Sequence, residues 1–169
     1  MPKKKTEEKL KATKTISPFK DWIDFEKEIR DFANKYKTTV VNQAKRTSDY
    51  FEMTCFNYIV KFYELNGYEL EATNLQARRY KYKCSPAGIQ SNFSHFEATF
   101  DSGKNIFLFE IQHNLAVQSS HDGNIFTTPD ISIIKKDGVQ YTKSYYDTKT
   151  IFSFVNNKDL MTFCEVKQF

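Results

Sequence analysis

Two carboxylates and one lysine in the C-terminal third of the chain have types and spacing suited to phosphate chemistry. Asp130 follows Pro129 at the start of an apolar run, and Glu165 and Lys167 lie two positions apart in a later run. Side chains two positions apart on a strand share one face, so Glu165 and Lys167 are expected side by side. Mg²⁺ takes oxygen ligands, usually one or two carboxylates plus water and phosphate. The pattern predicts that Asp130 and Glu165 bind a metal while Lys167 contacts the attacking water or the phosphate.

A helix over residues 49–65 is the strongest prediction among the elements that must position this site. Its apolar side chains recur at helical spacing, and Asn66-Gly67 supplies a stop signal. Glu52 falls on the same face as these apolar side chains. In one interpretation Asp49 and Glu52 form a capping box; in the other, Glu52 is a secondary metal ligand. Both interpretations remain open at this point.

The N-terminal part of the chain divides into a tail and another predicted helix. Residues 1–14 contain six Lys and two Glu, which accounts for the whole net charge of +4, so the remaining chain is neutral. Residues 1–17 are therefore interpreted as a basic flexible tail. Pro18 suits the first turn of a helix that runs toward Tyr36. We expect one domain over residues 18–169.

Most of the chain after Gly67 is predicted to form strands and turns. Alternating apolar residues predict strands over 68–72, 93–100, 105–118, 127–134 and 160–169, with a further one near 151–155. Turn signals stand at 101–104 and 137–138. On the 105–118 strand, Glu110 and Gln112 lie on the face opposite the apolar side chains. Solvent exposure explains them most simply, and Glu110 is held as a reserve metal ligand.

Residues 78–83 alternate basic and aromatic side chains. The basic members, Arg78, Arg79, Lys81 and Lys83, are the candidates for contact with a nucleic-acid backbone, where cations and aromatic rings often act together. An exposed edge strand protected by lysines would show the same pattern. The sequence does not separate the two.

Pro129-Asp130, the Glu165-Val166-Lys167 run and the order of elements around them resemble the PD-(D/E)xK nucleases, the restriction-endonuclease-like superfamily. The resemblance covers roughly residues 48–169. It implies an α/β restriction-endonuclease-like core with N-terminal helices followed by a mixed, mainly antiparallel sheet. It further implies Mg²⁺, with Mn²⁺ as a substitute, bound by Asp130, Glu165 and Glu52, and water positioned by Lys167.

The function implied by this resemblance is a Mg²⁺-dependent endonuclease acting on DNA rather than RNA, with restriction or defence as the usual role. The chain departs from the family pattern in two ways. Asp130 and Glu165 are 35 positions apart, which requires an insertion, and the sequence stops two residues after Lys167. We therefore expect that the last helix and strand of the core are missing and come from a further segment or an oligomer. The alternative is a non-catalytic nucleic-acid-binding or assembly module with the same fold.

Other classes of protein fit the sequence poorly. The three cysteines are odd in number and lack metal-ligand spacing, which favours reduced thiols in a cytoplasmic protein. The three histidines show no zinc-type pairing. No phosphate-binding loop, dinucleotide motif or serine-hydrolase motif is present in the sequence. The lysine-rich N-terminus is not followed by the apolar run of a signal peptide.

Overall fold

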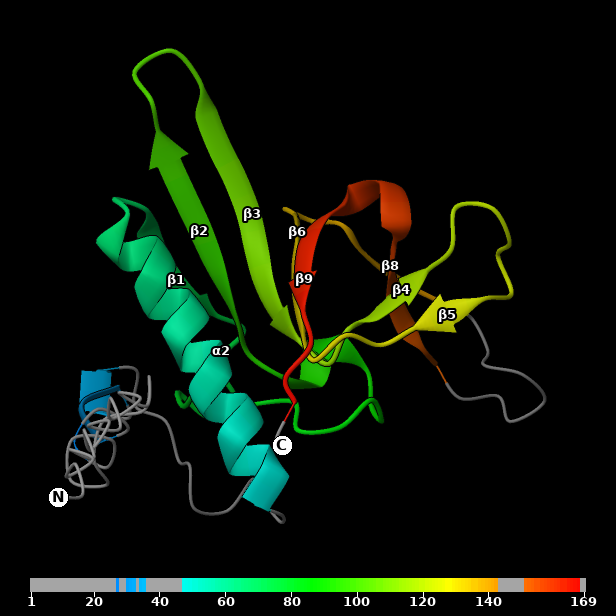
Figure 1. Ribbon diagram of the computed structural model, residues 1–169, viewed down its shortest axis with the longest axis horizontal. Helices are drawn as coiled ribbons and strands as arrows, with labels where there is room; N and C mark the ends of the chain where they lie inside the picture. Colours follow the sequence, from blue (N-terminus) through cyan, green and yellow to red (C-terminus); the bar gives the residue numbers. More distant parts are fainter. Residues whose placement is uncertain (1–26, 28–29, 33, 36–46, 143–150, 168–169) are drawn as a thin grey trace, which may run out of the picture.

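The computed structural model describes residues 27, 30–32, 34–35, 47–142 and 151–167, and these form a mixed α/β fold with two mainly antiparallel sheets (Figure 1). The elements are α2 (Thr47–Leu65), β1 (Glu69–Thr73), η1 (Gln90–Asn92), β2 (His95–Asp101), β3 (Ile106–His113), β4 (Ala116–Gln118), β5 (Phe126–Thr127), β6 (Ile131–Lys135), β7 (Val139–Tyr141), β8 (Ser153–Asn156), η3 (Asn157–Asp159) and β9 (Leu160–Cys164). The predicted tail and most of the helix predicted from Pro18 lie outside the described residues.

The larger sheet has the strand order β1-β2-β3-β6-β9, and each neighbouring pair is antiparallel. In the register, Ile111 of β3 lies opposite Ile133 of β6, and Ile131 of β6 lies opposite Cys164 of β9. The helix α2 lies across one face of this sheet (Figure 1). Strands β3, β6 and β9, which follow the helix in this order along the chain, therefore lie side by side and antiparallel, with the helix on one face of the sheet.

The core between α2 and the sheet is dominated by aromatic and branched side chains. Phe56 of α2 is fully buried and contacts the rings of Tyr82 and Phe96 with centroid distances of 5.9 and 6.1 Å. Burial of each large apolar side chain contributes roughly 1.5–3 kcal/mol. These contacts fix α2 over the sheet because apolar residues at helical spacing share one face of the helix. The helix predicted over 49–65 is confirmed, and it begins at Thr47.

The smaller sheet has the order β5-β4-β8-β7, with β4 and β8 parallel. Leu115, Val117, Ile134 and Val155 form a second buried cluster beneath it. Strands β7 and β8 come from the segment between Asp130 and Glu165. This long connection therefore supplies two strands to the smaller sheet. The strand near 151–155 is confirmed as β8.

The prediction of one continuous strand over 105–118 is wrong. Strand β3 ends at His113, and Asn114 has a left-handed backbone with φ of 49°. Asparagine tolerates this conformation better than most residues. The turn at Asn114 directs the chain from the larger sheet into β4 of the smaller sheet. Its backbone N–H donates to the carbonyl of Asp130 at 2.8 Å, which links the turn to the start of β6.

Other boundaries also differ from the sequence predictions. The stretch 127–134 is divided between β5 and β6, and β9 ends at Cys164. Residues 78–83 form no strand ladder, since their only bridge in the described chain pairs Gln76 with Arg79. The turns at 101–104 and 137–138 are present: the Gly103 N–H donates to the Asp101 carboxylate, and Asp137 has φ of 59°. No helix among the described residues is long and apolar enough to cross a membrane.

Candidate functional site

Asp130 lies immediately before β6, where that strand meets the end of β9. Its Oδ2 atom accepts a hydrogen bond of 2.7 Å from the backbone N–H of Val166. Val166 separates Glu165 from Lys167 in sequence. Because β6 and β9 are antiparallel with Ile131 opposite Cys164, residues preceding β6 meet residues following β9. The fold therefore brings the Pro-Asp pair and the Glu-x-Lys run to the same corner of the sheet.

Glu165 and Lys167 lie side by side, as their spacing predicts. The Lys167 Nζ atom is 3.6 Å from Glu165 Oε2, and the two side chains are 67% and 39% exposed, respectively. An exposed ion pair contributes little to stability because solvent screens it. Both groups are therefore accessible from solvent.

The chain at and after the end of β9 contacts the core beneath α2 through alternate residues. Cys164 and Val166 pack against the core cluster beneath the helix. Glu165 and Lys167, which alternate with them, follow the end of β9 and are exposed. Ser132 of β6 and Gln112 of β3 are cross-strand neighbours on the face of the sheet away from α2, since Ile131, Ile133 and Ile111 pack against the core under α2.

Glu52 projects from α2 toward the end of β3. Its Oε2 atom is 3.8 Å from Nε2 of His113 and 3.4 Å from Nδ2 of Asn114, which donates to it. Asp49 lies inside the first turn of α2 rather than at its N-cap, because the helix begins at Thr47. Glu52 thus contacts side chains at the end of β3 rather than serving only the helix terminus.

Two cysteines lie near the Asp130 corner, Cys55 on α2 and Cys164 at the end of β9. Burial first, and then the nearby Cys164, Asp130 and Glu52 in that order, raise the pKa of Cys55 to about 11. Burial, Asp130 and Glu165 likewise raise the pKa of Cys164. Both thiols are therefore protonated at neutral pH, which makes them poor metal ligands and poor nucleophiles. The influence of Asp130 and Glu52 on Cys55 shows that both carboxylates lie near it.

The Asp130 corner offers a metal at most the two carboxylates of Asp130 and Glu165 among the described residues. Within the described ranges, no group of three or more His, Cys, Asp and Glu side chains is placed to hold a metal ion. Glu52 therefore does not join Asp130 and Glu165 in a three-carboxylate site. Mg²⁺ commonly uses one or two carboxylates and takes its other ligands from water and phosphate. The Val166 N–H occupies one acceptor position of Asp130, and a carboxylate offers about four.

The basic side chains predicted to contact nucleic acid divide into two groups. Arg78 and Arg79 are exposed, and the Lys81 ammonium lies 4.9 Å from the ring centroid of Phe93. Lys83 instead is 1% exposed and donates to Gln90 Oε1 and to the carbonyl of Asn114. The prediction that Lys83 contacts nucleic acid at the surface is therefore wrong, because its ammonium group is hydrogen-bonded inside the protein.

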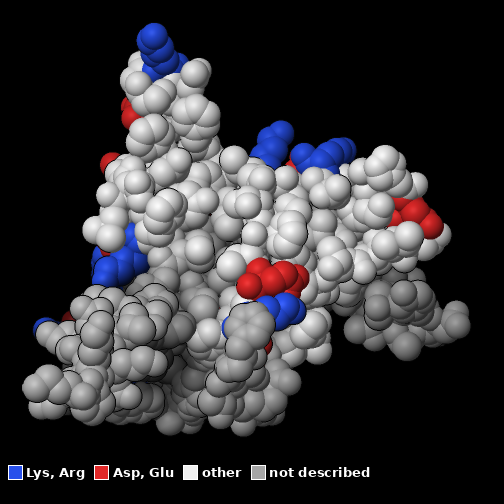
Figure 2. Space-filling view, in the orientation of Figure 1, with Lys and Arg blue, Asp and Glu red and all other residues white. Residues whose placement is uncertain are grey.

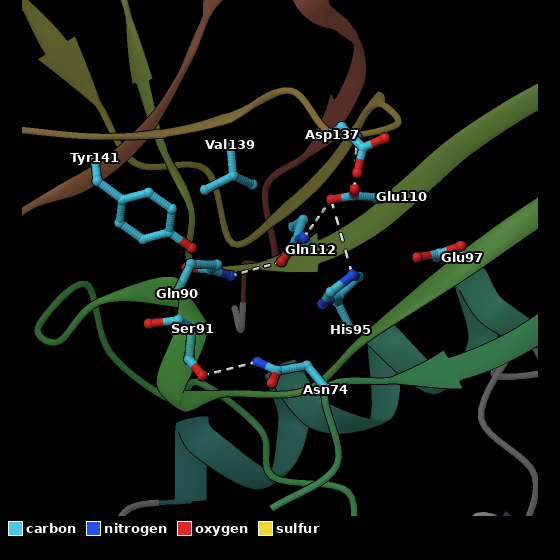
Figure 3. Close-up of a pocket in the computed structure, with 10 residues that line it drawn as sticks. All are labelled: Asn74, Gln90, Ser91, His95, Glu97, Glu110, Gln112, Asp137, Val139 and Tyr141. Atoms are coloured by element: carbon cyan, nitrogen blue, oxygen red, sulfur yellow. Dashed lines mark hydrogen bonds and ion pairs between the residues drawn. The ribbon is translucent and has the colours of Figure 1, made fainter.

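A pocket of about 310 Å³ lies against the sheet, and sequence reasoning did not predict it. It is lined by residues of strands β2, β3 and β7, by η1 and by Asn74, which follows β1 (Figure 3). Glu110 and Gln112, which we expected to face solvent, are 4% and 1% exposed and form part of its wall. The alternation of polar residues on β3 is the one sequence signal that could have indicated a buried polar wall here.

Charged groups on the face shown in Figure 2 are scattered: the described Lys and Arg side chains lie in separate groups with acidic side chains between them. Comparison with family models, curated proteins and solved structures finds no match to this chain. The function proposed below therefore rests on the arrangement of the residues in this chain.

Proposed function

We propose that this chain is a metal-dependent nuclease with a restriction-endonuclease-like core, acting on DNA as an endonuclease. The observation that supports this most directly is the hydrogen bond from the Val166 N–H to Asp130 Oδ2. It joins the Pro-Asp pair to the middle of the Glu-x-Lys run. Two further features support the proposal: the antiparallel order of β3, β6 and β9, and the helix α2 that carries Glu52 over them.

In this proposal Asp130 and Glu165 hold Mg²⁺ or Mn²⁺ at the corner of the sheet, and Lys167 acts beside them. The bound metal would stabilise the negative charge that develops on a phosphate under attack. Lys167, as an exposed ammonium, donates a hydrogen bond to the attacking water and holds it in line with the phosphorus atom. Glu52 takes a supporting role, because it contacts His113 and Asn114 rather than the two carboxylates.

The test is a cleavage assay with Mg²⁺ or Mn²⁺ on supercoiled plasmid, linear duplex DNA, single-stranded DNA and RNA. Plasmid nicking or linearisation distinguishes endonuclease from exonuclease action. We expect Asp130→Asn, Glu165→Gln and Lys167→Met each to lower the cleavage rate at least 100-fold. Asp130→Asn is preferred to alanine because the amide oxygen can still accept the Val166 N–H.

Matched controls are Glu71→Gln and Lys104→Met. Glu71 lies on β1, at the opposite edge of the sheet from β9, and Lys104 lies in the β2–β3 turn. Both side chains are exposed, so these variants should retain the wild-type rate. Equal rates for control and site variants would contradict the proposed site.

The second candidate is a non-catalytic nucleic-acid-binding or assembly module with the same fold. The observation that favours it is that no three-ligand metal group exists among the described side chains. A Mn²⁺ titration separates the two candidates. Binding that is weakened by Asp130→Asn and by Glu165→Gln supports the nuclease. Absence of cleavage together with Mn²⁺ binding unchanged in these variants would favour the silent module.

A further inference from the structure

The pocket on the face of the larger sheet away from α2 contains two glutamates in a directly opposed cross-strand pair. Glu97 of β2 lies opposite Glu110 of β3. Like charges in this arrangement repel each other unless each finds a partner. Lys136 binds Glu97 through an ion pair and hydrogen bond, whereas no lysine or arginine is paired with Glu110 in the described residues. Glu110 is instead held by neutral donors, so its negative charge stays in the pocket.

A chain of hydrogen bonds fixes how the amides around Glu110 are oriented. Lys83 donates to Gln90 Oε1 at 3.0 Å, so the Gln90 amide nitrogen must point away from Lys83. That nitrogen donates to Gln112 Oε1 at 2.8 Å, and Gln112 Nε2 donates to Glu110 Oε2 at 2.7 Å. A donor-only ammonium at one end and a carboxylate at the other permit one direction for both amides. The Glu110 carboxyl group is therefore held in one orientation with both of its oxygens acting as acceptors.

Several hydrogen-bonding positions in the pocket remain for a ligand. Glu110 Oε1 accepts the backbone N–H of Asp137 at 2.8 Å, which leaves each of its two oxygens a second lone pair. Gln112 Nε2 keeps one N–H. The His95 Nε2 atom is 3.9 Å from Glu110, beyond hydrogen-bond range. Burial lowers the pKa of His95 despite Glu110, Glu97 and Asp137, and Lys136 also lowers it, so the imidazole is neutral.

The wall of the pocket selects the class of ligand. The described residues that line it include three carboxylates and no Lys or Arg, so a phosphate group would be repelled. Figure 3 shows Val139 and Tyr141 of β7 on one side, opposite Asn74 and Ser91. An aromatic ring beside hydrogen-bonding groups suits a planar polar ring. A ligand with two adjacent N–H donors would satisfy the two oxygens of Glu110 together.

Among the nucleobases, guanine alone presents two adjacent donors, N1–H and the 2-amino group, with no acceptor between them. Adenine and cytosine place an unprotonated ring nitrogen beside the amino group, and uracil and thymine flank their N–H with carbonyls. Each of these acceptors would face a carboxylate oxygen of Glu110 and be repelled. Guanine also offers O6 and N7 as acceptors for the N–H groups of Gln112 and His95.

We propose that this pocket binds an unpaired guanine base, with Glu110 accepting its N1–H and 2-amino groups. The choice of a nucleobase rests on the proposed nuclease function. The position of the pocket fits that function, because Gln112 of β3 pairs with Ser132 of β6, and Ser132 pairs with Phe163 of β9, two positions before Glu165. A strand cleaved at the Asp130 corner would then be read at an extruded guanine bound against the same sheet.

The test is direct binding of nucleosides to the full chain, measured by calorimetry or by chemical-shift titration and without cleavage. Guanosine, inosine, adenosine, cytidine and uridine are compared, with arginine amide as a non-nucleoside that carries a similar donor fork. We expect guanosine to bind at least tenfold more tightly than inosine, which lacks the 2-amino group, and than every other ligand. Equal binding of guanosine and inosine, tighter binding of arginine amide, or no guanosine binding would overturn the proposal.

Two glutamine variants provide a matched comparison at the pocket. Glu110→Gln should weaken guanosine binding at least tenfold, and Glu97→Gln should leave it within twofold because Lys136 already neutralises Glu97. An equal loss in both variants would overturn the role of Glu110. If Glu110→Gln fails to fold, the wild-type comparison of guanosine with inosine decides. The two proposals can fail independently. Asp130→Asn tests the nuclease proposal through its cleavage rate, and this variant should bind guanosine as the wild type does.

Discussion

The Asp130 carboxylate accepts the backbone N–H of Val166 at 2.7 Å and so connects the start of β6 to the residue between Glu165 and Lys167. The same carboxylate that we propose as a metal ligand therefore also holds the chain that carries the other site residues. Structural and chemical effects of a change at Asp130 must be measured separately for this reason.

Asp130→Ala should free the segment that follows β9. A hydrogen bond to a charged group contributes about 1.5–3 kcal/mol to stability. We expect Asp130→Ala to lower the free energy of unfolding by about this amount and to speed hydrogen exchange of the Val166 amide. Asp130→Asn should lose less than half as much, because an oxygen acceptor remains. Unchanged Val166 exchange in the alanine variant would show that this bond does not hold the segment in solution.

His113 should make the protein less stable in acid. Burial, together with the charge of Lys83 and against the opposing effect of Asp49, lowers its pKa to about 3 from the usual 6.5. Between these pH values the unfolded state binds one more proton than the folded state, so stability falls as pH decreases. The contribution approaches about 1.4 kcal/mol per pH unit in that window.

His113→Phe tests this pH dependence while keeping a ring against Phe56, whose centroid lies 5.3 Å from that of His113. Urea unfolding measured from pH 7.5 to 4 should show a shallower loss of stability in the variant than in the wild type. His121→Phe is the matched control, because His121 is exposed. The same slope in the wild type and His113→Phe would show that His113 is not the group responsible.

Ser132 and Ser153 should respond oppositely to removal of the hydroxyl group. Both are buried, but Ser132 Oγ has no hydrogen-bond partner, whereas Ser153 Oγ accepts the Gln90 N–H at 2.9 Å. Burying an unpaired hydroxyl is costly, and leaving a buried N–H unpaired costs about 1–3 kcal/mol. Ser132→Ala should leave stability unchanged or raise it by up to about 1 kcal/mol, while Ser153→Ala lowers it. Denaturant unfolding of the two variants makes the comparison, and equal losses would contradict it.

Gln90 should be energetically coupled to Lys83, since its amide oxygen accepts one of the two hydrogen bonds given by the buried ammonium. Burial lowers the pKa of Lys83 to about 8, so most of the ammonium is still charged at neutral pH. Gln90→Leu should destabilise the protein by about 1–3 kcal/mol because Lys83 loses an acceptor.

A double-mutant cycle isolates this coupling. Adding Lys83→Met to Gln90→Leu should recover part of the loss, because the unpaired charge is then removed. Gln118→Leu serves as control, since its amide donates to the Gly123 carbonyl at an exposed position. Strictly additive effects of the two changes would show that Gln90 does not support the Lys83 charge.

Local patterns in the sequence predicted most of the elements. Apolar spacing placed a helix over 49–65, and turn signals at 101–104 and 137–138 are confirmed because Gly, Asn and Asp favour tight turns locally. Period-two spacing also predicted that Glu165 and Lys167 lie side by side. These features depend on a few neighbouring residues, which is why the sequence determines them.

Only the tertiary structure decided which polar residues are buried and which sites they form. Glu110 and Gln112 alternate with apolar residues like an exposed strand face, yet β7 and η1 cover them and create a pocket. Lys83 has the sequence context of a surface cation but lies inside, where Gln90 and Asn114 accept from it. Burial depends on partners 7 to 31 positions away, and no local pattern records those contacts.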